Sequence, residues 1–126
     1  MRALLALLVL TACAPSDTLR EQTNAMRYRV NTVAMAANDA GDQVKAYCAI
    51  GDRAVCARLI TLHDGVRATI KAARTIVDAY EVGAATAPGE VSEAAQKHAQ
   101  EALDRAEVIE RELIDAVRAA REKIGG

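Results

Sequence analysis

The chain contains two histidines, His63 and His98, the residue type most often used for acid–base catalysis and metal binding. Asp64 directly follows His63, but adjacent residues of a helix point in different directions and do not form a proton relay. No serine or cysteine stands at a spacing that would complete a catalytic triad. A metal site shared by His63 and His98 would require two helices that bring these positions together. We therefore expect ordinary surface or boundary histidines and no metal site.

A stretch of acidic side chains near the C-terminus is the other candidate for acid–base chemistry. Three arginines (Arg105, Arg111 and Arg118) are interleaved with these carboxylates, which predicts a solvated charged face rather than a catalytic carboxylate pair in a cleft. The chain also lacks a Gly-rich phosphate loop, zinc-ligand spacing and a nucleophile elbow. We predict no enzyme activity, no catalytic residue and no cofactor. The acidic residues are Glu107, Glu110, Glu112 and Asp115.

The N-terminal residues have the pattern of an export signal. Arg2 follows the initiator methionine, an uninterrupted nonpolar run covers residues 3–10, and the run ends in Leu10-Thr11-Ala12-Cys13. The run is too short to span a bilayer, which needs about 20 residues. This pattern resembles the signal peptide and lipobox of bacterial lipoproteins, including those encoded by phages.

The lipoprotein resemblance implies cleavage before Cys13 and lipidation of that cysteine. Residues 1–12 would then be a signal peptide and residues 13–16 a short tether. The alternative is an ordinary secretory signal that is cut near Ala14 and loses Cys13. In lipoproteins of enteric bacteria, an aspartate after the lipidated cysteine favours the inner membrane. Because this chain has Ala14 there, the resemblance implies the outer membrane and a periplasmic location, with several acyl chains giving stable anchoring.

Cys48 and Cys56 are the remaining cysteines. In the oxidising compartment that an exported chain meets, such a pair usually forms a disulfide. Residues eight apart in one continuous helix are about 12 Å apart, beyond the Cα separation of about 7 Å that a disulfide tolerates. A bridge therefore predicts that the chain reverses at Gly51. Two free thiols are the alternative, and no third Cys or His completes a metal set.

The composition argues against nucleic-acid binding and in favour of long helices. The formal net charge is −1, and the chain has three Tyr, no Phe and no Trp. It therefore has neither a basic footprint nor a set of aromatic side chains on which bases would stack. Abundant alanine, only two prolines and interspersed charges are typical of packed helices.

Three stretches repeat nonpolar or small residues in steps of three or four, the spacing of one helical face. We predict the first helix from about residue 17 to residue 50, starting after Pro15 at a capping-box pair, Thr18 and Glu21. The pattern stays in phase across Gly41, and a break at Gly41-Asp42 is the alternative. The predicted face comprises Leu19, Thr23, Met26, Val30, Val33, Ala37, Gly41, Val44 and Cys48.

Turn signals separate the three stretches. Gly51 suits the left-handed conformation that ends a helix, and Asp52 suits the N-cap of the next helix. Residues 83–89, with sequence GAATAPG, form the second connection. Gly65 stays within the second helix, where close packing would explain it. The second face comprises Val55, Leu59, Leu62, Val66, Thr69, Ala73, Ile76 and Tyr80, and the third Val91, Ala95, Ala99, Ala102, Ala106, Ile109, Leu113, Ala116, Ala120 and Ile124.

Helices of similar length joined by short turns predict the fold. We expect an all-α, up-down-up antiparallel three-helix bundle over residues 17–126, with one disulfide at the first turn. The alanine-rich third face predicts a thin core that buries little area. Among the tyrosines, Tyr80 should be in the core and Tyr47 should cover the disulfide. Tyr28, flanked by Arg27 and Arg29, should lie off the core, where it would contact lipid headgroups, a partner or only solvent.

These expectations favour a membrane-anchored cell-envelope lipoprotein that acts without catalysis, through contacts with another envelope protein or with itself. An adaptor, a structural tether and a phage exclusion or lysis factor all fit. Because residues 14–16 reach only about 10 Å, the bundle would stay close to the membrane. The alternative is an envelope lipoprotein that binds a small ligand or a metal in the bundle core, which a cavity or converging histidines would favour.

Overall fold

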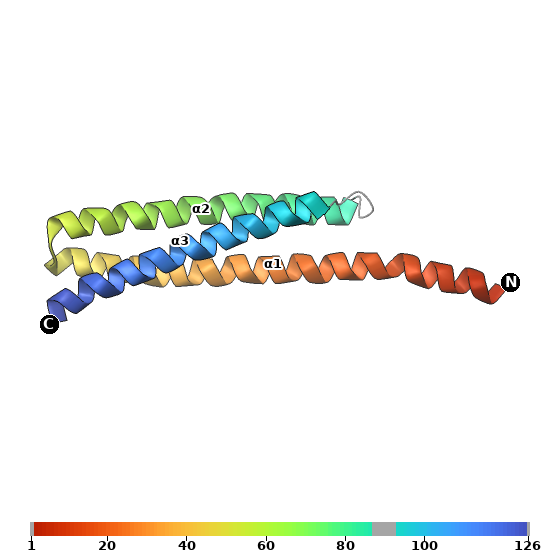
Figure 1. Cartoon of the computed structure of the whole chain (residues 1–126), viewed down its shortest axis with the longest axis horizontal. Coiled ribbons are helices and arrows are strands. Elements are labelled where there is room, and N and C mark those ends of the chain that lie inside the picture. Colours follow the sequence, from red (N-terminus) through yellow and green to blue (C-terminus); the bar gives the residue numbers. More distant parts are fainter. Residues whose placement is uncertain (1, 87–92, 126) are drawn as a thin grey trace.

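The computed structural model describes the backbone of residues 2–86 and 93–125, and the side chains of residues 18–86 and 93–125. Three α-helices follow one another along the chain: α1 (Arg2–Ile50), α2 (Arg53–Thr86) and α3 (Glu93–Gly125). In Figure 1, α2 runs back alongside α1, and α3 returns in the direction of α1. The predicted up-down-up three-helix bundle is confirmed.

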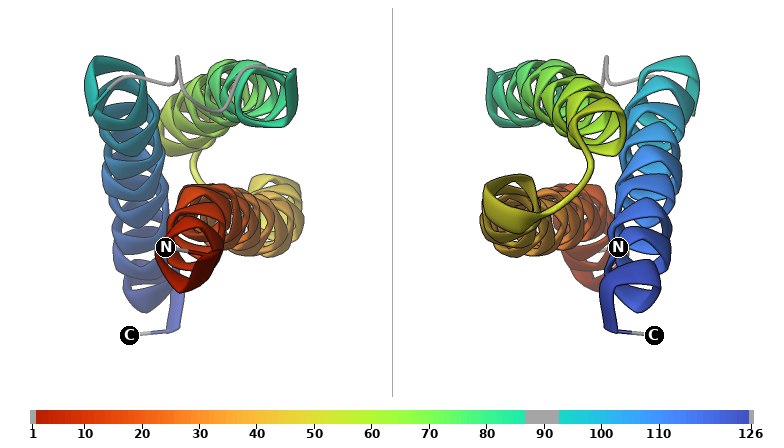
Figure 2. Two further views of the ribbon diagram at one scale, coloured as in Figure 1. Left: turned by 90° about the vertical axis from the view of Figure 1, so that its right-hand side faces the viewer. Right: turned by 90° about the vertical axis from the view of Figure 1, so that its left-hand side faces the viewer.

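The third helix crosses the pair formed by α1 and α2 at an incline. It begins beside the C-terminal part of α2 and ends beside the part of α1 that leads into the first turn (Figure 1). The end-on views of Figure 2 show α3 as one wall of the bundle, passing from the level of α2 to the level of α1. Each helix consequently packs against both of the others.

The predicted start of the first helix is wrong. Helix α1 is already continuous from Arg2, and Thr18 and Glu21 lie inside it, so the capping-box spacing does not mark a helix start. The nonpolar residues before Pro15 are mostly Ala and Leu, which are strong helix formers and favour this extension. At Gly41-Asp42 the helix continues without a break, as the phase of the nonpolar pattern predicts.

The second helix is longer than predicted. It passes through Gly83 and ends at Thr86, inside the stretch expected to be a connection. A single glycine costs a helix only about 1 kcal/mol relative to alanine, so it need not end one. The remaining turn signal, Pro88-Gly89, and the predicted face residue Val91 lie outside the described residues.

The core consists of two clusters of buried side chains that follow each other along the bundle. The larger one extends from the first turn to the middle of the bundle, and the smaller one lies towards the start of α3. The smaller cluster comprises Met26, Val30, Val77, Tyr80, Ala99 and Leu103. The larger comprises Val33, Ala37, Ala40, Val44, Tyr47, Leu59, Val66, Ile70, Ala73, Ala102, Ala106, Leu113, Val117 and Ala120.

The predicted faces were too narrow. Ile70, Val77, Leu103 and Val117 are buried although none belongs to a predicted face. A helix that packs against two neighbours buries a stripe wider than one line of residues in steps of three or four. The predicted alanine-rich third face is confirmed, since four of the seven buried residues described for α3 are alanines, but α3 also fully buries two leucines and a valine. At the ends of that face, Ala95 and Ile124 are exposed rather than buried.

Candidate functional site

The turn between α1 and α2 is closed by a disulfide between Cys48 and Cys56. Their sulfur atoms are 2.01 Å apart and their Cα atoms 5.1 Å apart. The chain reverses between them, as the bridge requires. The Asp52 carboxylate accepts hydrogen bonds from the backbone N–H groups of Ala54 (2.9 Å) and Val55 (3.0 Å), which confirms the predicted N-cap of α2.

Gly51 is required at this turn for a reason that the sequence prediction did not give. No glycine in the described residues has a positive φ, so the expected left-handed conformation is wrong. A Cβ atom at Gly51 would instead lie 2.4 Å from Cζ of Tyr47. The Tyr47 side chain is 6% exposed, and its hydroxyl accepts a hydrogen bond from the Asp52 N–H at 3.3 Å. Tyr47 thus closes this end of the bundle against the turn.

The two histidines lie at different levels of the bundle. His63 of α2 packs over Gly41 of α1, where an added Cβ would be 2.5 Å from the imidazole Nε2. His98 is exposed near the start of α3. Gly65 faces Ile109 of α3, and Ile109 is about 16 Å of helix away from His98. The structure therefore does not form the shared histidine site, and within its described residues no group of three or more potential ligands could hold a metal ion.

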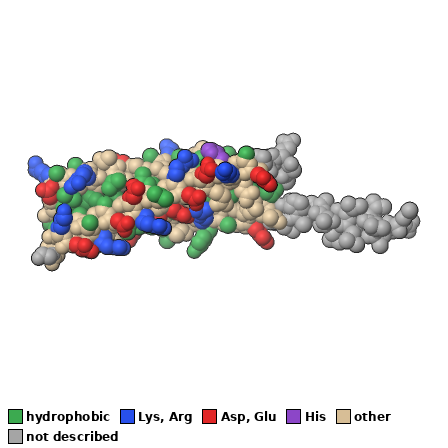
Figure 3. All heavy atoms as spheres, viewed as in Figure 1, with side chains coloured by type: hydrophobic (Ala, Val, Ile, Leu, Met, Phe, Trp, Pro, Cys, Tyr) green, Lys and Arg blue, Asp and Glu red, His purple; other side chains and the backbone are tan. Residues whose placement is uncertain are grey.

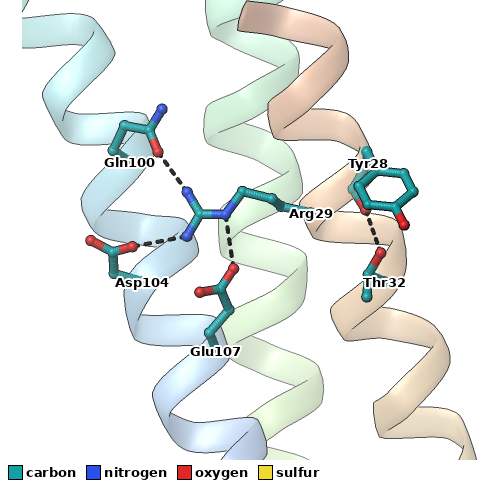
Figure 4. Close-up of polar contacts among 6 residues, drawn as sticks. All are labelled: Tyr28, Arg29, Thr32, Gln100, Asp104 and Glu107. Carbon is teal, nitrogen blue, oxygen red and sulfur yellow. Dashed lines mark hydrogen bonds and ion pairs between the residues drawn. The ribbon is translucent and has the colours of Figure 1, made fainter.

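Arg29 joins α1 to α3 (Figure 4). Its guanidinium donates to Glu107 at 2.8 Å, to Gln100 at 2.6 Å and to Asp104 at 2.9 Å. The hydrogen bond to Glu107 is the main reason that the pKa of Arg29 is raised above its ordinary value. Figure 4 also shows Tyr28 pointing away from this network, and its side chain is 73% exposed.

Arg27 makes the equivalent connection between α1 and α2. Its guanidinium donates to Glu81 and, at 2.8 Å, to Asp78. These two hydrogen bonds, the one to Glu81 first, raise its pKa. Of the Arg-Tyr-Arg sequence, Tyr28 is therefore the one side chain that is not bonded to a neighbouring helix.

Tyr80 is buried in the smaller core cluster, as predicted. Its hydroxyl donates a hydrogen bond to the Gln22 side-chain oxygen at 3.0 Å. Burial raises the pKa of this phenol. Thr23, the one buried polar residue among the described side chains, donates its hydroxyl to the Leu19 carbonyl at 2.8 Å. The hydroxyls of Tyr80 and Thr23 are therefore both satisfied inside the bundle.

The acidic stretch of α3 is only partly the solvated face that was predicted. Glu112 and Asp115 are exposed, whereas Glu107 is held by Arg29 and Glu110 is half-buried. Burial, and then the neighbouring charge of Glu107, raise the pKa of Glu110. Within this stretch, Glu107 is thus a structural partner of Arg29, and Glu112 and Asp115 are surface groups.

A surface groove runs between α1 and α2. It has a volume of about 520 Å³, and its lining residues all come from these two helices. Three of them, Arg67, Lys71 and Arg74, are exposed cations at spacings of four and three along α2. The sequence contains this spacing, but the pattern alone does not show that the cations border a groove, because that depends on how α1 and α2 pair.

The predicted lipidation site, Cys13, lies within α1, and its side chain is outside the described side chains. Within the parts of the chain that the structure describes, no helix has a nonpolar stretch long enough to cross a membrane.

The fold and the features above define an all-helical, disulfide-closed three-helix bundle. No protein-family model matches the chain, and neither the curated proteins nor the solved structures contain a match.

Proposed function

We propose that this protein is a lipid-anchored protein of the bacterial cell envelope that acts without catalysis, by contacting another envelope protein. The observation that carries the proposal is the Leu10-Thr11-Ala12-Cys13 sequence at the end of a short nonpolar run. It implies an exported chain whose anchor precedes the bundle directly. The disulfide is in keeping with export, because such bridges persist in oxidising compartments.

The geometry of the bundle supports a role in binding rather than in chemistry. Arg27, Arg29 and Tyr80 use their polar groups to join helices to one another. A metal- or ligand-binding role would need the two histidines to converge, but they lie apart. What the molecule offers is a long surface with charges of both signs, as Figure 3 shows for one face. Such a surface is suited to recognising a protein partner.

Two measurements test this proposal. Incorporation of a labelled fatty acid should be seen in the wild-type chain and should be lost in Cys13→Ser. In addition, a C-terminally tagged protein should be cross-linked in intact cells and purified from membranes, with Cys13→Ser alongside. We expect one specific envelope protein that is recovered only with the anchored form. Labelling that persists in Cys13→Ser would overturn the anchor, and recovery of the protein alone would overturn the role in partner binding.

A further inference from the structure

We propose that the groove between α1 and α2 is the docking site for an acidic helical segment of a partner protein. This inference rests on the proposed function, because it names the surface through which the anchored protein would act. The groove would be completed by a fourth helix lying beside α1 and α2.

The charge of the groove determines the chemistry of its occupant. Within the described residues, Arg67, Lys71 and Arg74 take part in no ion pair, whereas Arg27 and Arg29 are each held by two carboxylates of a neighbouring helix. The three cations follow one another along one side of α2. A helix with carboxylates at the same spacing would match them along its length.

The lining of the groove suits a helix. Its lining includes Ala34 and Ala37 from α1 and Ala68 from α2, with Ile70 buried beneath them. Alanine side chains are short, so a helix can approach closely, as helices do where small residues meet. The long rim side chains then reach around the occupant, covering it with their nonpolar stems while their charged ends meet its carboxylates.

The two ends of the groove differ in charge, which sets the direction in which a helix would bind. Asp64 lines it on the side nearer the first turn, and Arg74 lines it nearer the other end of α2. A bound acidic helix should therefore place its carboxylates beside residues 67–74 and avoid a negative charge beside Asp64, where like charges would repel.

Two other occupants fit the observations less well. A second copy of this chain would have to offer the exposed face of α3, where Arg105, Arg111 and Arg118 are interleaved with the acidic residues. A flat lipid surface would reach the cationic rim and Ala68 but not the recess, whose buried lining includes Ala37 and Ile70. An acidic helix satisfies both the rim and the recess.

The test is site-specific photo-crosslinking in cells that express the full chain. A photoreactive amino acid replaces Ala68 in the groove, and a matched control carries it at Ala119, which is exposed on α3. We expect an adduct at Ala68 whose cross-linked peptide, identified by mass spectrometry, carries carboxylates at helical spacing. A cross-link to a second copy of the chain, to lipid or to nothing would overturn the proposal.

Charge reversal gives the second arm. Combining Arg67→Glu, Lys71→Glu and Arg74→Glu should lower the yield of the Ala68 adduct about tenfold, since several modest charge pairs are lost together. Arg105→Glu with Arg111→Glu is the matched control and should leave the adduct unchanged. Circular dichroism and the disulfide state must match the wild type in both. An adduct that persists in a folded triple variant would overturn the proposal. Replacing the mapped carboxylates of the partner with lysine should restore the adduct yield of the triple variant.

The two proposals can fail separately. If fatty-acid labelling is absent but the charge-dependent adduct at Ala68 is present, the anchor falls and the docking site stands. If labelling and partner recovery succeed but Ala68 forms no adduct, the docking site falls and the proposed function stands.

Discussion

At the scale of single residues, the glycines of the bundle differ in the atoms that a Cβ atom added to them would meet. At Gly51 an added Cβ would lie 2.4 Å from the Tyr47 ring, and at Gly65 it would lie 3.5 Å from the Ile109 Cδ1 atom. The first distance is a clash with a buried ring, and the second is an ordinary van der Waals contact. The two positions should therefore respond oppositely to alanine.

We predict that Gly51→Ala lowers the free energy of unfolding by about 1–3 kcal/mol, because the Tyr47 ring must leave its place in the core. Gly65→Ala should raise it by up to about 1 kcal/mol, because alanine favours the helix and finds room. Urea unfolding followed by circular dichroism measures both. Equal effects of the two substitutions would contradict the packing described at the turn.

Arg29 and Arg118 provide a second comparison. Arg29 bonds to three side chains of α3, whereas Arg118 has its nearest carboxylate, Asp115, at 4.0 Å on its own exposed face. Arg29→Ala should therefore destabilise the bundle by about 1 kcal/mol, and Arg118→Ala by close to nothing. The measurement is thermal unfolding at low and high salt. A loss at Arg29 that salt does not reduce would point to packing rather than charge.

The raised pKa of Glu110 predicts that the free energy of unfolding depends on pH. Because burial raises its pKa in the folded state, the folded state favours the protonated carboxyl. The contribution of Glu110 to stability is most favourable at pH values below 4.5, the ordinary pKa of the carboxyl group. This contribution is lost as the pH rises through the folded-state pKa. Glu110→Gln should therefore stabilise the protein at pH 7 by a few tenths of a kcal/mol at most and give no gain at pH 3. An equal gain at both values, measured by urea unfolding, would contradict this.

At the scale of helices, the disulfide and the hairpin depend on each other. The bridge spans eight positions and joins the last turn of α1, which holds Cys48, to the first turn of α2, which holds Cys56. Loss of the bridge, which closes a loop of about nine residues, should lower the free energy of unfolding by about 2.6 kcal/mol, because the unfolded chain gains entropy. Cys48→Ser with Cys56→Ser should show this loss, and reduction of the wild-type protein should reproduce it. A reduced protein as stable as the oxidised one would contradict the role of the bridge.

The sequence was sufficient for some features of the helices and not for others. Nonpolar periodicity placed Met26, Val66 and Leu113 correctly in the core, and the cysteine pair located the first turn. It did not reveal that Leu103 and Val117 are buried, because their burial depends on the inclined path of α3 between two neighbours. Likewise, the role of Gly51 depends on the position of the Tyr47 ring, and the groove depends on the lateral pairing of α1 with α2.

At the scale of the whole molecule, the ends of the bundle differ in composition. One end is closed by Tyr47, the disulfide and the capped start of α2. The other end is where α1 enters the bundle and α3 begins. Helices of this length separate the two ends by about 50 Å. If Cys13 is the anchor, its position before the bundle in α1 puts the disulfide end far from the membrane.

This arrangement predicts the orientation of the anchored protein, and it bears on the groove as well. A click-reactive amino acid at Ala94, near the start of α3, and another at Ala57, near the disulfide, can each carry a donor dye beside vesicles that contain an acceptor lipid. In an upright bundle, energy transfer from Ala94 should be strong and from Ala57 weak, since about 50 Å separates the two ends. Equal transfer from both would mean that the bundle lies flat.

In a flat bundle, the groove would remain accessible to a partner only if α3, rather than α2, faced the lipid. A third label at Ala68 tests this, because its energy transfer would then be weaker than that of the other two labels.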